Sequence, residues 1–410
     1  MVLGGVLAGL PRSEAAAVVR DGPRTVVAFG ALDCLVAPAD PFVALDALTG
    51  GWWAGYAAYE LGHEVERVMP RERDHTDRSG AIAPLALVRF AARAEVAVDG
   101  SVTWCGTGPA RRALERAFAD PAPTAGPRPA TADWTSSLDR FDYEQRVRTI
   151  QELIRAGECY QVNLTRRLDG PALDPVALWD AVGAGNPAPH AMFWHGGEVA
   201  PHAPTIVSAS PERFLRVDGE AVESRPIKGT ASRATRLRTS EKDRAENVMI
   251  VDLARNDLGR VCRPGSITVP ELCRIEAHPG LVHLVSTVRG ARRNDVGFGA
   301  LLRATFPPAS ITGAPKPRVM QAIEDLEPVT RGVYCGATGW IDADRDRADL
   351  AVAIRTFACN DRATTFGVGA GITIDSDPAA EWAETELKAA RLLALAGART
   401  NRALAAAAPR

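Results

Sequence analysis

Short strand-like runs lie only a few residues apart along much of this 410-residue sequence, so tight turns must join several of them. Three such runs near the C-terminus are Gly332–Ile341, Leu350–Ala358 and Thr364–Ile374. Successive parallel strands need a crossover of about a dozen residues or more, and these gaps are too short for one. Helical patterns such as Asp142–Ala156 interleave with the strands. The sequence therefore predicts an α+β fold with largely antiparallel sheets rather than a doubly wound parallel sheet.

A Pro- and Ala-rich stretch over residues 121–132 is the best candidate for a boundary in the chain. Its composition is typical of a linker or a surface crossing. We expect a β-rich N-terminal region over residues 1–120, a second region over 140–398 that carries the candidate chemistry, and a frayed tail over 399–410. The aromatic side chains of the segment GGWWAGYAAYELG are expected to fill a core layer: Trp52, Trp53, Tyr56 and Tyr59.

Charge and cysteine content argue against several classes of function. The 48 Lys and Arg nearly balance the 50 Asp and Glu, so no basic excess favours nucleic acid or an anionic membrane. The seven cysteines are dispersed and never form a C-x-x-C pair, which argues against a disulfide framework or a thiolate zinc site. No apolar run approaches the roughly 18 residues of a membrane span, and the start lacks the basic region of a signal peptide. We expect a cytoplasmic protein that binds a small molecule or another protein.

A lysine and an acid-bearing helix lie close together in the stretch Ser224–Cys262. Lys228 stands between Pro-Ile and Gly-Thr, where we expect a strand to give way to a turn. Ser240 can cap the following helix, with Asp243 at the capping-box position, and Glu246 lies on its apolar face. Taken alone, either the lysine or the glutamate is more typical of a solvated surface than of a site. Together they mark a candidate site.

The last predicted helix, Pro378–Leu395, carries a charged stripe. Glu381, Glu384 and Lys388 lie at i, i+3 and i+7, within roughly 60° of one another around the axis. A solvated stripe is the simpler interpretation, but the strand before this helix has glycines at alternate positions, which is unfavourable unless a ligand or another backbone comes close. Such a strand could offer N–H groups to a carboxylate. With only carboxylates available as metal ligands, the metal suggested is a hard cation such as Mg²⁺.

Nine motifs in one order make the sequence similar to the chorismate-utilising enzymes. They are SASPERF, SRPIKGT, EKDRAENVMIVDLARNDLGRV, HLVSTVRG, FPPASITGAPKPRVMQAIEDLEP, YCGATGW, AIRTF, GAGI and EWAETELKA. The resemblance covers about Tyr143–Leu395, while the N-terminal third is similar only more loosely. It implies the fold of that family, with two packed, largely antiparallel sheets flanked by helices, and it implies Mg²⁺ as the cofactor.

The resemblance also implies roles for individual residues. Glu246 and Glu384 match Mg²⁺ ligands, with Asp243 and Glu381 as nearby acids. Glu212 matches the acid that protonates the leaving C4 hydroxyl of chorismate, a role that benefits from a raised pKa in a desolvated site. The remaining matches are residues that hold or line the substrate: Gln161, His283, Thr312, Tyr334, Arg355, Gly369, Ala370, Gly371 and Lys388.

Two positions narrow the reaction that the resemblance implies. Gln161 stands where water-using relatives carry a lysine base, which favours ammonia as the nucleophile. Lys228 stands in P-I-K-G-T, where anthranilate synthases typically have P-I-A-G-T. It is the implied covalent nucleophile, which adds at C2 as the C4 hydroxyl leaves and is then expelled when ammonia adds at C4. These features resemble aminodeoxychorismate synthase component I, the subfamily that forms 4-amino-4-deoxychorismate for p-aminobenzoate and folate synthesis.

The ammonia source and two alternative functions follow from the same comparison. The sequence has no G-x-C-x-G glutaminase motif, so we expect ammonia from a separate glutaminase subunit. One alternative is an anthranilate synthase component I or an aminodeoxyisochorismate-forming enzyme, in which Lys228 would be incidental. The other is a non-catalytic paralogue that binds a ligand or the glutaminase. The sequence leaves open whether the N-terminal region holds a tryptophan pocket.

Overall fold

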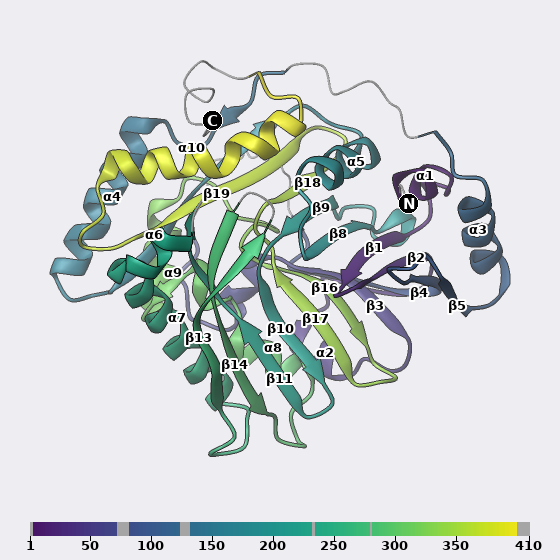
Figure 1. Ribbon diagram of the computed structural model, residues 1–410, viewed down its shortest axis with the longest axis horizontal. Helices are drawn as coiled ribbons and strands as arrows, with labels where there is room; N and C mark the ends of the chain where they lie inside the picture. Colours follow the sequence, from purple (N-terminus) through teal and green to yellow (C-terminus); the bar gives the residue numbers. More distant parts are fainter. Residues whose placement is uncertain (1–2, 72–81, 124–131, 232–233, 279–280, 400–410) are drawn as a thin grey trace.

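The computed structural model describes residues 3–71, 82–123, 132–231, 234–278 and 281–399 (Figure 1). Most of the predicted linker, residues 124–131, and nearly all of the predicted tail, 400–410, lie outside these ranges. The division of the chain at residues 121–132 therefore stays a prediction. In the described part of the chain, no helix is long and apolar enough to span a membrane.

Several helices begin and end where local sequence signals predicted. The Ser240 hydroxyl accepts a hydrogen bond from the Asp243 N–H at 3.2 Å, and the Asp377 carboxylate accepts one from the Ala380 N–H at 2.8 Å, so both predicted caps are confirmed. The helices are α1 (Leu3–Ala8), α2 (Pro41–Asp46), α3 (Gly108–Ala119), α4 (Arg140–Arg155), α5 (Pro175–Gly185), α6 (Ala234–Thr239), α7 (Glu241–Gly259), α8 (Phe298–Thr305), α9 (Lys316–Leu326) and α10 (Pro378–Leu395).

The strands are mostly short, and their pairings are antiparallel throughout the described ranges. They are β1 (Ala16–Asp21), β2 (Arg24–Val36), β3 (Trp52–Ala57), β4 (Leu85–Val96), β5 (Val102–Gly106), β6 (Thr135–Ser136), β7 (Gln161–Gly170), β8 (His190–His195), β9 (Thr205–Ser210), β10 (Arg213–Asp218), β11 (Ala221–Arg225), β12 (Ile227–Ala231), β13 (Thr268–His278), β14 (Leu281–Ala291), β15 (Gly313–Ala314), β16 (Ala337–Asp342), β17 (Arg347–Val352), β18 (Thr356–Cys359) and β19 (Thr364–Ile372).

Hydrogen bonds join the strands into one continuous sheet. Its order is β7–β19–β18–β9–β8–β1–β2–β4–β3–β16–β17–β10–β11–β14–β13, with β12 beside β14 and β15 beside β7. The N-terminal strands β1–β4 lie in the middle of this order. The N-terminal region therefore shares its sheet with the rest of the chain, and the expected α+β fold is confirmed.

The sheet folds over so that its two halves face each other. Trp194 of β8 packs edge-on against Tyr56 of β3 at a ring separation of 5.4 Å, and its indole N–H donates to the Ala54 carbonyl at 2.9 Å. The prediction of an aromatic core layer is confirmed, since Trp52, Trp53, Tyr56 and Tyr59 are all buried. Helices cover the outer faces, and Figure 1 shows α10 lying along β19 with α4 beside it.

Two strand predictions were wrong at points that matter for the site. The predicted strand Leu350–Ala358 is two strands, β17 and β18, and the break between them holds Arg355 at φ 53°. Lys228 does not lie at a strand–turn boundary but inside β12. There the register with β14 shifts by one residue between Ile227 and Thr230, and Gly229 has φ 83°, so Lys228 lies in a β-bulge. In both places long-range strand pairing overrides the local signal.

Candidate active site

The Lys228 amine lies where three separate segments of the chain meet. Its Nζ donates a hydrogen bond to the Ser310 carbonyl, which follows α8, at 3.0 Å. A Cβ added to Gly371 of β19 would lie 2.3 Å from Gln161 Nε2 and 3.7 Å from Lys228 Nζ. Gln161 is 1 % exposed, and its Oε1 has no hydrogen-bond partner among the described residues. A buried amide oxygen without a partner is costly, and a ligand hydrogen can satisfy it.

Charged groups from three segments surround Lys228: α7, the residue before β10, and α10. Burial lowers its pKa, while the carboxylates of Glu246 and Glu212 raise it and the Lys388 ammonium lowers it again; Glu384 also raises it. The shift caused by burial prevails, so the amine is easier to deprotonate than an ordinary lysine. A neutral amine is the form that can act as a nucleophile.

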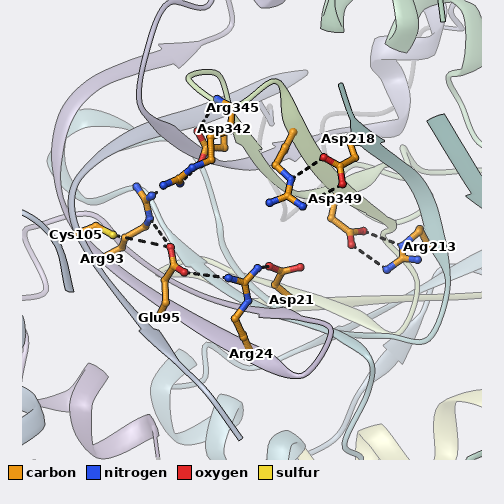
Figure 2. Close-up of polar contacts among 11 residues, drawn as sticks. Asp21, Arg24, Arg93, Glu95, Cys105, Arg213, Asp218, Asp342, Arg345 and Asp349 are labelled. Carbon is orange, nitrogen blue, oxygen red and sulfur yellow. Dashed lines mark hydrogen bonds and ion pairs between the residues drawn. The ribbon is translucent and has the colours of Figure 1, made fainter. Parts of the chain in front are cut away.

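Glu212 is buried, so its carboxyl group keeps its proton to a higher pH than an ordinary glutamate. It is 4 % exposed, and burial raises its pKa even though the adjacent Ser310 hydroxyl lowers it. The Ile227 N–H donates to Glu212 Oε1 at 3.4 Å. The next residue, Arg213, forms a two-point ion pair with Asp349, 3.1 Å from Nε to Oδ1 and 3.0 Å from Nη2 to Oδ2 (Figure 2). This pair anchors the start of β10, and Glu212 is placed to donate a proton.

The glycine strand β19 turns part of its backbone away from β7. The N–H groups of Asn163 and Thr165 in β7 are bonded on the side opposite β19, to a backbone carbonyl and a carboxylate, each at 2.8 Å. The residues across from them, Gly371 and Gly369, must then direct their own N–H groups to the far edge of β19. Ala370 pairs with β7 instead, so its N–H is not available at that edge. The substrate-binding role of Ala370 stays a prediction.

The far edge of β19 is open beyond the point where β18 begins. Within the described ranges, no strand pairs with Gly369 or Gly371 on that side, because β18 begins only at Thr356, after the irregular backbone at Arg355. Lys388 Nζ donates to the Gly369 carbonyl at 3.0 Å. Burial lowers the pKa of Arg355, and its guanidinium has no hydrogen bond or ion pair with any described residue. The Lys388 ammonium and two N–H groups at this edge suit a carboxylate ligand, and Arg355 lies at the break before β18.

Glu246 and Glu384 lie on different helices, α7 and α10, yet both carboxylates act on Lys228. Glu384 is about half exposed and pairs with Lys388 at 2.6 Å. Two carboxylates from separate helices fit Mg²⁺, which usually takes one or two protein carboxylates and completes its shell with waters and substrate oxygens. The described residues include no group of three or more His, Cys, Asp or Glu side chains placed to hold a metal.

The two neighbouring acids are engaged with the protein. Ser376 Oγ donates to Glu381 Oε1 at 2.6 Å, and Glu381 is 6 % exposed. The Asp243 side chain lies against Gly229 of the bulge: its Cβ and Cγ are each 3.1 Å from the place that a Cβ on Gly229 would occupy. These contacts attach α10 to the loop before it and α7 to β12. Both acids therefore support the elements that carry Glu246 and Glu384.

The other predicted residues lie around the same space. His283 is 2 % exposed on β14, directly beside the bulge of β12. Thr312 is fully buried next to β15, and its hydroxyl donates to the Pro308 carbonyl at 3.2 Å. The Tyr334 ring packs on Gly367, where a Cβ would come within 2.1 Å of it, and burial raises the Tyr334 pKa. A side chain at Gly367 would displace this ring.

Sequence reasoning missed three residues that shape the site. The Ser310 carbonyl holds Lys228. The buried pair Glu327 and Arg331 bonds the backbone of β7 just after Gln161 and the Ile311 carbonyl just before Thr312. Ser310 lies in the Pro- and Gly-dense loop of residues 306–317, whose composition was the only local signal. Backbone contacts of this kind depend on tertiary structure.

A comparison of the sequence with protein families finds a match to the chorismate binding enzymes over residues 31–394. The chain belongs to the chorismate binding enzyme family. It is 35% identical to aminodeoxychorismate synthase component 1 of Klebsiella aerogenes over 413 residues, which cover 96% of this chain and 87% of that one.

Other similar proteins are named either aminodeoxychorismate synthase or anthranilate synthase. The chain is 40% identical to aminodeoxychorismate synthase component 1 of Salmonella typhimurium, a match covering 66% of this chain and 61% of that one. It is 42% identical to anthranilate synthase component 1 of Streptomyces coelicolor, covering 69% and 58%. Anthranilate synthase component I from Streptococcus pneumoniae has a similar solved structure, with a TM-score of 0.79 at 25% identity, covering 90% and 92%.

Proposed function

We propose that this protein aminates chorismate with ammonia, in the presence of Mg²⁺, to form 4-amino-4-deoxychorismate. Membership of the chorismate binding enzyme family supports the substrate, and two of the relatives above are named aminodeoxychorismate synthase. The observation that carries the proposal is the Lys228 amine, whose pKa burial lowers, held between Gln161 and the acid Glu212. No water-activating lysine stands at position 161.

The proposed reaction proceeds in two substitutions. The lone pair of the neutral Lys228 amine forms a bond to C2, the two conjugated ring double bonds shift, and the C4–O bond breaks. Glu212 donates its proton to that oxygen, which leaves as water. Ammonia then bonds to C4, the double bond shifts back, and the C2–N bond to Lys228 breaks. The ionised Glu212 takes one proton from the new ammonium group, so both residues return to their starting forms.

Substrate binding is assigned to groups that surround these two residues. The Arg355 guanidinium and the N–H groups of Gly369 and Gly371 would hold one carboxylate of chorismate. Glu246 and Glu384 would hold Mg²⁺, and the bound ion supplies positive charge for the ring carboxylate. The ammonia is proposed to come from a separate glutaminase subunit, in keeping with the "component 1" in the relatives' names.

The test is to incubate the purified protein with chorismate, Mg²⁺ and ammonium and to identify the product by mass and fluorescence. The expected product is 4-amino-4-deoxychorismate, and the Lys228→Ala variant should not form it. Anthranilate as the main product would refute the proposal and favour the function named for the Streptomyces coelicolor relative. No turnover of chorismate by the unaltered protein would favour a non-catalytic paralogue.

A further inference from the structure

Glu327 and Arg331 form a buried ion pair directly after α9. Their side chains are 3% and 2% exposed, and the carboxylate bonds the guanidinium twice, at 2.6 Å and 2.9 Å. Burial alone would lower the pKa of Arg331, but the Glu327 carboxylate raises it well above its ordinary value, so the guanidinium stays charged. A buried ion pair is weak evidence for stability, because apolar residues of similar size often serve as well. Its bonds to the backbone are therefore the feature to explain.

The pair occupies the edge of β7 where a neighbouring strand runs out. Strand β15 is only two residues long and pairs with Gln161 and Val162. Beyond it, Arg331 Nη2 donates to the Asn163 carbonyl at 2.6 Å, and Glu327 Oε1 accepts from the Thr165 N–H at 2.8 Å. A donor and an acceptor so placed do what the next residues of a strand would do. The pair thus completes the edge of the strand that carries Gln161.

The same guanidinium also holds the loop that contacts Lys228. Arg331 Nη1 donates to the Ile311 carbonyl at 2.9 Å. Ile311 lies between Thr312 and Ser310, whose carbonyl accepts the hydrogen bond from the Lys228 amine. One rigid side chain therefore joins β7 to the loop of residues 306–317. The position of the Lys228 partner relative to Gln161 depends on it.

We propose that Glu327 and Arg331 are positioning residues for the reaction. They fix the loop of residues 306–317 on β7. The Ser310 carbonyl then holds the Lys228 amine in place, with the Gln161 amide beside the same position on Gly371. Neither side chain touches the reacting atoms in this arrangement. The inference rests on the proposed chorismate site, but not on which product forms there.

The test replaces the whole pair with apolar side chains of similar size, in the variant Arg331→Met/Glu327→Leu. Removing both charges together avoids leaving one buried without a partner. The matched control is Arg292→Met, which removes another buried arginine that bonds two backbone carbonyls, at 3.0 Å and 2.9 Å, and pairs with Asp346. Arg292 follows β14 at the end of that strand opposite His283.

Two measurements separate positioning from stability. Hydrogen exchange of the backbone amides in residues 309–314 should be at least about tenfold faster in the double variant and unchanged in Arg292→Met. The kcat for chorismate consumption should fall by about 10²-fold, the effect of a misplacement of roughly 1 Å, with a smaller change in KM. Arg292→Met should keep the kcat of the unaltered protein, even if its thermal midpoint drops as far.

Unchanged exchange at residues 309–314 in a folded double variant would overturn the proposal. So would a kcat within about twofold of the unaltered protein together with faster exchange, because the loop would then move without consequence. Formation of anthranilate by the unaltered protein would refute the proposed function alone, since both measurements would still apply to the same site. If the unaltered protein consumes no chorismate, exchange alone decides whether the pair holds the loop.

Discussion

Gly371→Ala should damage the active site without straining the backbone. Gly371 does not have a positive φ, so alanine can adopt its conformation. The new Cβ would lie 2.3 Å from Gln161 Nε2 and 3.3 Å from its Cδ, whereas ordinary contact begins near 3.4 Å. The Gln161 amide must therefore move by about 1 Å away from the new methyl group. A misplacement of that size costs about 10²-fold in rate, which corresponds to about 2.7 kcal/mol of transition-state stabilisation.

The assay is the initial rate of chorismate loss, with the product identified by mass and thermal unfolding followed in parallel. Overpacking should cost about 1–3 kcal/mol of folding stability, so the variant is expected to fold. Gly183→Ala is the control: Gly183 is exposed in α5 with nothing within 4 Å of the new methyl group. It should gain up to about 1 kcal/mol of stability at unchanged rate. A folded Gly371→Ala protein with a rate within about threefold of the unaltered protein would show that Gln161 and Lys228 need no common geometry.

Three further perturbations address the acid, the nucleophile and the metal. Glu212→Gln should lower kcat by about 10²–10⁴-fold. It should also abolish the fall in rate at alkaline pH, because that fall marks the loss of the Glu212 proton, which the raised pKa moves to higher pH. If the alkaline fall persists in the variant, it belongs to another group. Lys228→Arg should be inactive, because arginine stays charged. In the unaltered protein the rate should rise with pH through the lowered pKa of Lys228. Mass spectrometry of quenched reactions should find chorismate-derived mass on the peptide that contains Lys228, and none on the same peptide of the Lys228→Arg variant. Chelation should abolish turnover, and added Mg²⁺ should restore it. The Glu246→Gln variant should need a higher Mg²⁺ concentration for half-maximal activity, at an unchanged thermal midpoint. Full activity in excess chelator would contradict the metal assignment.

Helix ends were predictable because their signals are local. The caps at Ser240 and Asp377 bond N–H groups three residues along the chain, and both helices begin at the next residue. The break at Arg355 had no such signal, because a left-handed φ at an arginine arises from what the surrounding structure imposes. The bulge at Lys228 was mistaken for a turn because Pro-Ile-Lys-Gly fits a turn locally, whereas pairing with β14 decides the outcome.

The candidate site was predictable as a set of residues but not as a geometry. Alternating glycines indicated a close approach to the backbone of β19, and the structure directs the N–H groups of Gly369 and Gly371 to the open edge. Which residues face that edge depends on the β7 register, so Ala370 could not be separated from its neighbours by sequence. The Ser310 carbonyl was invisible for a related reason, since a backbone acceptor leaves no mark on residue type.

Burial moves the two reacting groups in opposite directions, and this lets them act at the same pH. It raises the pKa of Glu212 and lowers that of Lys228, so each group is more readily neutral than an ordinary side chain of its kind, while the attraction between them opposes both shifts. A substrate with two carboxylates would raise the lowered pKa of Lys228 back toward its ordinary value and so oppose its attack. The cations Arg355 and Lys388 offset that charge, as Mg²⁺ would when bound. The positive groups around the site therefore do more than hold the substrate, because they also oppose the rise in the Lys228 pKa that a bound anion would cause.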